Sequence, residues 1–152
     1  MLHLHQRRHQ RLLQYLLLLP LLLLLSGCPK DPYRAAIQGS DDVANGVSSG
    51  IKITAKYYSV GTFSDSQKVF AATYLTVVTD CNITFRKNVT DVHNSGQVGI
   101  AAFLPIADGF VNCVNNSAPL SRDPKVQDAL KMVDSAIRSI SLAISSAKGV
   151  KQ

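Results

Sequence analysis

The feature that most constrains the fold is an apolar stripe near the C-terminal end of the chain. Its members follow one another at steps of four, three, four, three, four and three residues: Val126, Leu130, Val133, Ile137, Ile140, Ile144 and Ala147. This spacing marks one face of an α-helix. Asp123 and Pro124 supply an N-cap and a proline at the first helical position, and Lys148 and Gly149 supply a C-terminal cation and a stop. The pattern predicts a helix over residues 124–148 whose apolar face needs partner helices.

A second helix is predicted over residues 65–94. Ser64 and Gln67 form the S-x-x-Q pattern of a capping box, which marks a helix start. Apolar residues then continue at mostly helical spacing, although the segment 74–85 is rich in β-branched residues that favour a strand. Because strict alternation is absent, the pattern favours a helix, and a strand over 74–85 stays the alternative.

The segment 98–114 is very apolar and predicts a short helix. Asn94-Ser95-Gly96 before it reads as a turn, and residues 115–119 after it read as a loop. Pro105 lies inside this segment and should kink the helix, because proline removes one backbone donor and clashes with the preceding turn.

The remaining segment, residues 33–59, carries a heptad-like stripe of Ile37, Ser40, Ala44, Val47, Ile51, Thr54 and Tyr58. It also holds Gly39, Gly46 and Gly50, each of which costs about 1 kcal/mol in a helix relative to alanine. Gly46 and Gly50 share a face. They indicate either a close approach by another helix or a weak, frayed helix, and the sequence leaves both readings open.

Four helical segments joined by short loops predict an all-α fold, an antiparallel four-helix bundle over residues 33–149. The cysteines support this arrangement. The midpoint between Cys81 and Cys113 is residue 97, at the expected turn, so both lie at the same height on facing helices of an antiparallel hairpin. A disulfide between them is expected if the chain is exported to an oxidising compartment, and two buried free thiols are the alternative.

The N-terminal segment has the composition of an export signal. Arg7, Arg8 and Arg11 precede an apolar run from Leu12 to Leu25 that is fourteen residues long. A membrane-spanning helix needs about 20 apolar residues, so the shorter run is typical of a secretion signal.

Leu25-Ser26-Gly27-Cys28 ends this segment and resembles the lipobox of bacterial lipoprotein precursors at all four positions. The resemblance covers residues 1–28 only. It implies a signal peptide of residues 1–27, cleavage before Cys28, acyl groups on Cys28, and a lipidated tether of residues 28–32, where two prolines argue against a helix. Residue 29 is proline and not the aspartate that resembles an inner-membrane retention signal, which favours the outer membrane as the place of the anchor. The alternative is an ordinary secretory signal that happens to hold a cysteine.

Charge and residue types exclude several functions of the mature chain. Cleavage would lower the net charge from +6 to +3 and leave no Lys/Arg cluster, so we expect no nucleic acid as a binding partner. All ten acidic residues are aspartate, so the chain lacks the glutamates that a di-iron helical bundle uses as ligands. His93 is the one histidine after Cys28, and it is expected to be a solvated helix-end residue rather than a catalytic base or a ligand. We therefore expect no catalytic site, metal or cofactor.

The function expected from these features is a non-enzymatic interaction or scaffold domain. It would be tethered to the membrane in the cell envelope and would bind an envelope protein or a second copy of itself. The alternative is a bundle that binds a small apolar ligand, in a pocket that opens where Pro105 kinks its helix and that is lined by Phe103 and Phe110. An envelope hydrolase or redox enzyme is the third possibility.

Overall fold

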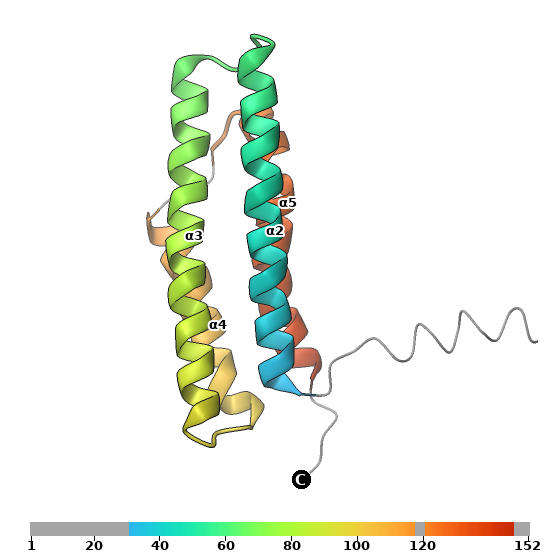
Figure 1. Cartoon of the computed structure of the whole chain (residues 1–152), viewed down its shortest axis with the longest axis vertical. Coiled ribbons are helices and arrows are strands. Elements are labelled where there is room, and N and C mark those ends of the chain that lie inside the picture. Colours follow the sequence, from blue (N-terminus) through green and yellow to red (C-terminus); the bar gives the residue numbers. More distant parts are fainter. Residues whose placement is uncertain (1–30, 118–120, 148–152) are drawn as a thin grey trace, which may run out of the picture.

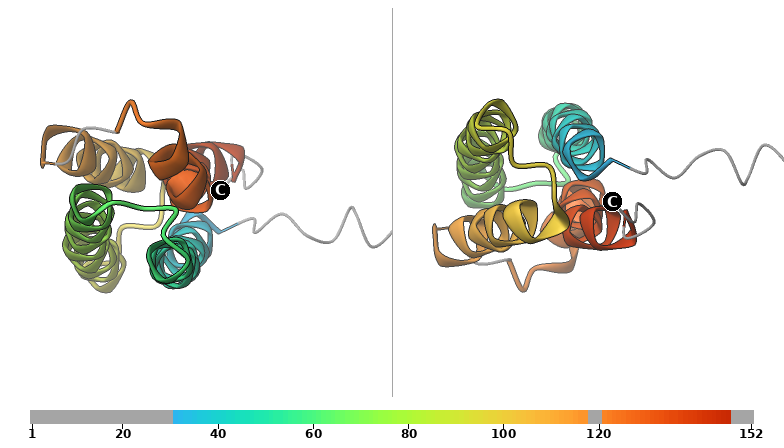
Figure 2. Two further views of the ribbon diagram at one scale, coloured as in Figure 1. Left: turned by 90° about the horizontal axis from the view of Figure 1, so that it is seen from above. Right: turned by 90° about the horizontal axis from the view of Figure 1, so that it is seen from below.

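The computed structural model describes residues 31–117 and 121–147, and this part of the chain is an antiparallel bundle of four helices (Figure 1). The helices are α2 (Pro32–Ser59), α3 (Asp65–Asn94), α4 (Ile100–Ser117) and α5 (Pro124–Ser146). The end views in Figure 2 show them at the corners of a square, in chain order. Each helix packs on its two neighbours, and the diagonal pairs make few contacts. The all-α prediction is confirmed.

The beginning of α2 corrects one expectation. The side chain of Asp31 accepts a hydrogen bond of 3.0 Å from the backbone N–H of Tyr33, and Pro32 is the first helical residue. Proline fits this position because its missing N–H would have no partner inside the helix. The expectation of a tether through residue 32 was therefore wrong at its last residues. Residues 28–30 lie outside the described part of the chain.

Helix α3 begins and ends where it was predicted, and the strand alternative for residues 74–85 is wrong. The predicted capping box is formed: the backbone N–H of Ser64 donates to Gln67 Oε1 at 2.7 Å, and the N–H of Gln67 donates to Ser64 Oγ at 3.3 Å. Four threonine hydroxyls in this helix donate to the carbonyl four residues earlier: those of Thr76, Thr79, Thr84 and Thr90. These threonines therefore satisfy their hydroxyls inside the helix.

Helix α4 starts two residues later and ends three residues later than predicted. It continues through Pro105, and Asn115, Asn116 and Ser117 extend it where a loop was expected. With 18 residues it is much shorter than α3, which has 30. In consequence, α4 covers only the part of α3 nearest the turn between them (Figure 1).

Helices α2 and α5 approach each other closely where α2 carries glycine. A Cβ atom placed on Gly46 would lie 3.2 Å from Val133 Cα, and one on Gly39 would lie 2.9 Å from Ile140 Cγ1. Side chains at these positions would therefore hold the two helices apart. Of the two readings of the glycines, close helix approach holds and the frayed helix is wrong.

The glycine face also changes which side of α2 is buried. Ser40, Val47 and Thr54 of the predicted stripe are buried, whereas Ala44 is exposed, and Ile51 and Tyr58 are 55% and 39% exposed. The pattern counted large apolar residues as core, but the tightest contacts of α2 use residues without large side chains. On α5 and at its C-cap, Ala147, by contrast, all seven stripe residues are buried.

Candidate functional site

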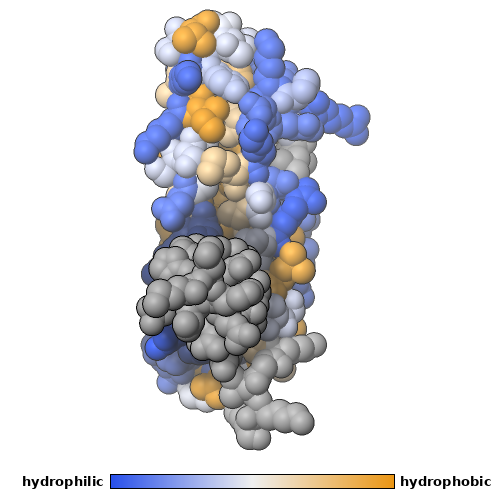
Figure 3. All heavy atoms as spheres, turned by 90° about the vertical axis from the view of Figure 1, so that its right-hand side faces the viewer, coloured by the Kyte–Doolittle hydropathy of each residue, from blue (hydrophilic) through white to orange (hydrophobic). Residues whose placement is uncertain are grey.

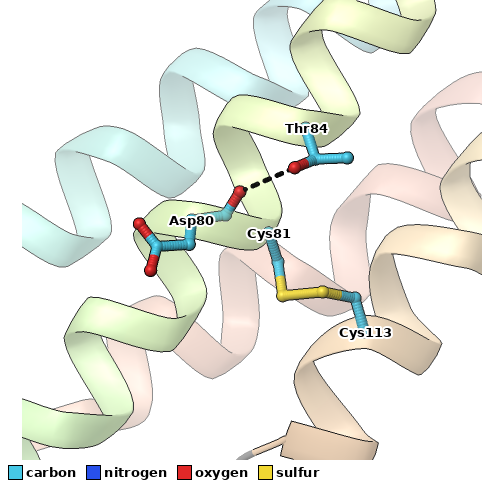
Figure 4. The surroundings of a disulfide bond; sticks show 4 residues. All are labelled: Asp80, Cys81, Thr84 and Cys113. Atoms are coloured by element: carbon cyan, nitrogen blue, oxygen red, sulfur yellow. Dashed lines mark hydrogen bonds between the residues drawn. A yellow bond between two sulfur atoms is a disulfide. The ribbon is translucent and has the colours of Figure 1, made fainter.

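The disulfide predicted from the sequence is formed. Cys81 on α3 and Cys113 on α4 are joined, with 6.0 Å between their Cα atoms (Figure 4). Cys81 is almost fully buried, and Cys113 is partly exposed. One turn along α3, Thr84 directs its hydroxyl to the Asp80 carbonyl at 3.1 Å, as the dashed line in Figure 4 marks. The disulfide ties the two helices about halfway along α3.

An apolar groove of about 320 Å³ lies beside the disulfide, between α3 and α4. One wall, on α3, is made by Cys81, Thr84, Phe85 and Asn88. The other wall, on α4, is made by Pro105, Ile106, Gly109, Phe110 and Cys113. The rings of Phe85 and Phe110 lie 5.3 Å apart between centroids and are both nearly buried, so aromatic carbon borders the deep part of the groove.

The groove exists because α4 lacks bulky side chains on this line. Pro105, Gly109 and Cys113 follow one another at steps of four residues, which places them along one side of the helix. A Cβ atom on Gly109 would meet nothing within 4 Å in the described part of the chain. This run of small residues beside a cysteine was the signal in the sequence that could have located the groove.

The two aromatic residues expected to line a pocket are placed differently. Phe110 lines the groove, whereas Phe103 is fully buried in the core and is not among the groove-lining residues. Phe103 packs instead near Tyr33, with 6.5 Å between the ring centroids. Pro105 does border the groove, as the sequence suggested.

His93 is not the solvated side chain that was expected. Its ring stacks on Tyr33, with 3.8 Å between centroids and 12° between planes. Nδ1 is buried without a hydrogen-bond partner among the described residues. Asp91 points elsewhere, because it pairs with Lys87 at 2.7 Å. The expectation failed because Tyr33, the stacking partner, comes from the first turn of α2, sixty residues away in sequence.

Polar contacts at the opposite end of the bundle tie together the starts of α3 and α5. Gln67 Nε2 of the α3 cap donates to Asp123 Oδ2 at 2.6 Å, while Asp123 Oδ1 accepts from the Lys125 amide at 2.9 Å. The pKa of the Asp123 carboxyl is lowered from 3.8, chiefly by the Gln67 hydrogen bond, with burial acting against it and the α5 amides adding to it. One carboxylate thus serves two helix starts.

Acid is expected to remove the stabilisation that this carboxylate supplies. Because the folded-state pKa of Asp123 is lowered, its contribution is present above pH 3.8 and is lost as the pH falls through the folded value. The Asp123→Asn variant keeps a capping oxygen without the charge. Urea unfolding should show wild type more stable than this variant at pH 6, and the gap should narrow at pH 3. A gap that stays constant would contradict this assignment.

Two further findings concern membranes and metals. None of the helices formed by residues 31–117 and 121–147 combines the length and the apolarity needed to cross a bilayer. The same residues contain no group of three or more histidine, cysteine or acidic side chains placed to hold a metal ion. Cys28, the expected lipidation site, lies outside the described residues.

Comparisons with known proteins found nothing similar: no family model matches the chain, and neither do curated proteins or solved structures.

Proposed function

We propose that this chain is a lipoprotein precursor whose mature form is anchored in a membrane of the cell envelope through acyl groups on Cys28. The observation that carries this proposal is Leu25-Ser26-Gly27-Cys28 at the end of a fourteen-residue apolar run behind three arginines. Two or more acyl chains anchor a protein stably, at about 0.8 kcal/mol for each buried methylene.

The start of α2 adds a geometric consequence. The helix is capped by Asp31, three residues after Cys28, and three residues span at most about 11 Å. The bundle end that holds the start of α2 and the turn between α3 and α4 would therefore face the membrane surface closely. The 28 residues of α2 rise about 42 Å, so the turn between α2 and α3 would stand far from the membrane.

The second part of the proposal is that the bundle acts by binding other proteins rather than by catalysis. Nine large apolar side chains of the described residues are substantially exposed: Ile51, Tyr58, Val60, Val69, Phe70, Ile83, Val98, Met132 and Leu142. Figure 3 shows such side chains reaching the surface on the side formed by α2 and α5, bordered by polar ones. Exposed apolar side chains mark an interaction site where they gather into one patch, and this is the patch that the proposal assigns to a partner.

The anchor is tested by fractionation of the native host expressing either wild type or the Cys28→Ser variant. We expect wild type to sediment with membranes and to need detergent for release. The Cys28→Ser variant should remain unprocessed, so it keeps its apolar signal segment and lacks acyl groups. Labelling with a fatty-acid analogue separates the two, because only wild type should carry label. Label on both proteins, or on neither, would overturn the proposal.

A second candidate function follows from the groove beside the disulfide. Its volume of about 320 Å³ lies at the lower end of the range for ligand pockets, and its walls are mainly apolar. An envelope protein that binds a small apolar molecule there is the alternative to a pure interaction domain.

The groove is tested by filling it. The Gly109→Phe variant places a ring where a Cβ meets open space, so the fold should be kept. If the groove binds apolar molecules, an apolar fluorescent probe should bind wild type and lose at least tenfold in affinity in this variant. The control is Ala101→Phe, an exposed position on the same helix outside the groove. Equal binding by both variants would exclude the groove as the site.

A further inference from the structure

The disulfide is itself part of the wall of the groove between α3 and α4, because Cys81 and Cys113 are both among the groove-lining residues. The two cysteines are not equally accessible. Cys81 is 5% exposed and belongs to the core, whereas Cys113 is only partly buried. A molecule that enters the groove therefore reaches the bond from the Cys113 side.

The route to Cys113 is open and uncharged. Gly109 lies one turn before it on α4, and a Cβ atom at Gly109 would meet nothing within 4 Å among the described residues. None of the groove-lining residues carries a charge. Figure 4 shows the carboxylate of Asp80 directed away from the bond between the two sulfurs. The groove thus suits a neutral, apolar group and offers no partner to a charged one.

A thiol can break this bond by exchange. The thiol gives its proton to water, and the thiolate attacks Cys113 Sγ. A new S–S bond forms there, and the old bond breaks with its electron pair on Cys81 Sγ, which takes a proton from water. The product is a mixed disulfide on Cys113, with Cys81 as a buried thiol.

Two reactions can follow from the mixed disulfide. Cys81 remains on the facing helix, where the closed bond has 6.0 Å between the Cα atoms, so its thiolate can attack Cys113 Sγ and release the incoming thiolate. Alternatively, a second thiol of the partner attacks the partner's sulfur in the mixed disulfide. The partner then leaves oxidised, and both cysteines of this chain are left as thiols.

We propose that Cys113 is the sulfur through which this chain exchanges disulfides with an envelope protein, whose cysteine lies in an apolar segment that enters the groove. The position of the disulfide in the groove wall argues for a thiol as the occupant, and the uncharged walls argue for apolar residues beside it. The inference rests on the second candidate function, since the groove must bind apolar groups.

Two neutral peptides test the inference on the mature chain in detergent: acetyl-Leu-Cys-Leu-amide and acetyl-Ser-Cys-Ser-amide. Acid stops the reaction, and mass spectrometry of proteolytic fragments locates the adduct. We expect at least tenfold more adduct on Cys113 than on Cys81, and a rate at least fivefold higher for the leucine peptide. Gly109→Phe should abolish this preference, and Ala101→Phe, at an exposed position outside the groove, should keep it.

Comparing variants in one detergent cancels any partitioning of the peptides into micelles. Equal rates for the two peptides in wild type would mean that the bond is reached by unfolding, and adduct mainly on Cys81 would mean a different route; either result overturns the inference. Displacement of the apolar fluorescent probe by acetyl-Leu-Ala-Leu-amide separates the two proposals. Displacement without a preference in rate overturns the exchange alone, whereas a probe that does not bind the groove and equal rates together overturn both.

Discussion

Replacing Gly46 with leucine is expected to destabilise the bundle by up to about 3 kcal/mol, because the new side chain has no space. Its Cβ would lie 3.2 Å from Val133 Cα and 3.3 Å from the Met132 carbonyl oxygen. These are backbone atoms of α5, so no side-chain rotation relieves the contact, and α2 must move away from the helix it packs on. Guanidinium unfolding followed by circular dichroism measures the loss.

Gly109→Leu is the matched control for this variant. Both glycines lie inside helices, and both substitutions gain helix propensity of up to about 1 kcal/mol. Gly109 has open space where Gly46 has α5, so the control should be neutral or more stable than wild type. A Gly46→Leu variant as stable as Gly109→Leu would show that α2 and α5 are not in close contact.

Removing the disulfide is expected to lower the free energy of unfolding by about 3–4 kcal/mol. The bond closes a loop with a sequence separation of 32 residues, and the chain-entropy model assigns that stabilisation to a loop of this length. Reductant should shift the guanidinium midpoint of wild type to that of the double variant Cys81→Ala/Cys113→Ala.

The double variant also serves as the control, since reductant should leave its midpoint unchanged. A wild-type midpoint insensitive to full reduction, verified by thiol counting, would mean that the α3–α4 hairpin is held by side-chain packing alone.

Much of the fold was predictable because local signals and tertiary packing agree. On α5 the apolar stripe is the buried face, and Asp123-Pro124 caps the helix as expected. The cysteine pair was predictable because its midpoint falls at the turn between α3 and α4. Each of these features depends on spacing along the chain, which the sequence displays directly.

The predictions that were wrong concern residues whose burial or contacts are decided by a neighbouring helix. Hydrophobic periodicity on α2 selected Ile51 and Tyr58 as core, but α5 approaches the glycine face instead, and the large residues are left outside. The stacking of His93 on Tyr33 joins residues from different helices, which no local pattern encodes. The same limit applies to the candidate site, because the groove depends on how α4 packs on α3. The sequence correctly indicated that Pro105 and Phe110 line it, but the prediction that Phe103 lines it was wrong.

The central claim is that Cys28 is the acylated first residue of a membrane-held bundle. The most direct test is the mass of the intact protein, purified in detergent from its native membrane and measured under denaturing conditions. The account predicts the mass of residues 28–152 plus acyl groups, less two hydrogens for the disulfide between Cys81 and Cys113. A mass without acyl groups, or one that includes residues before Cys28, would contradict it.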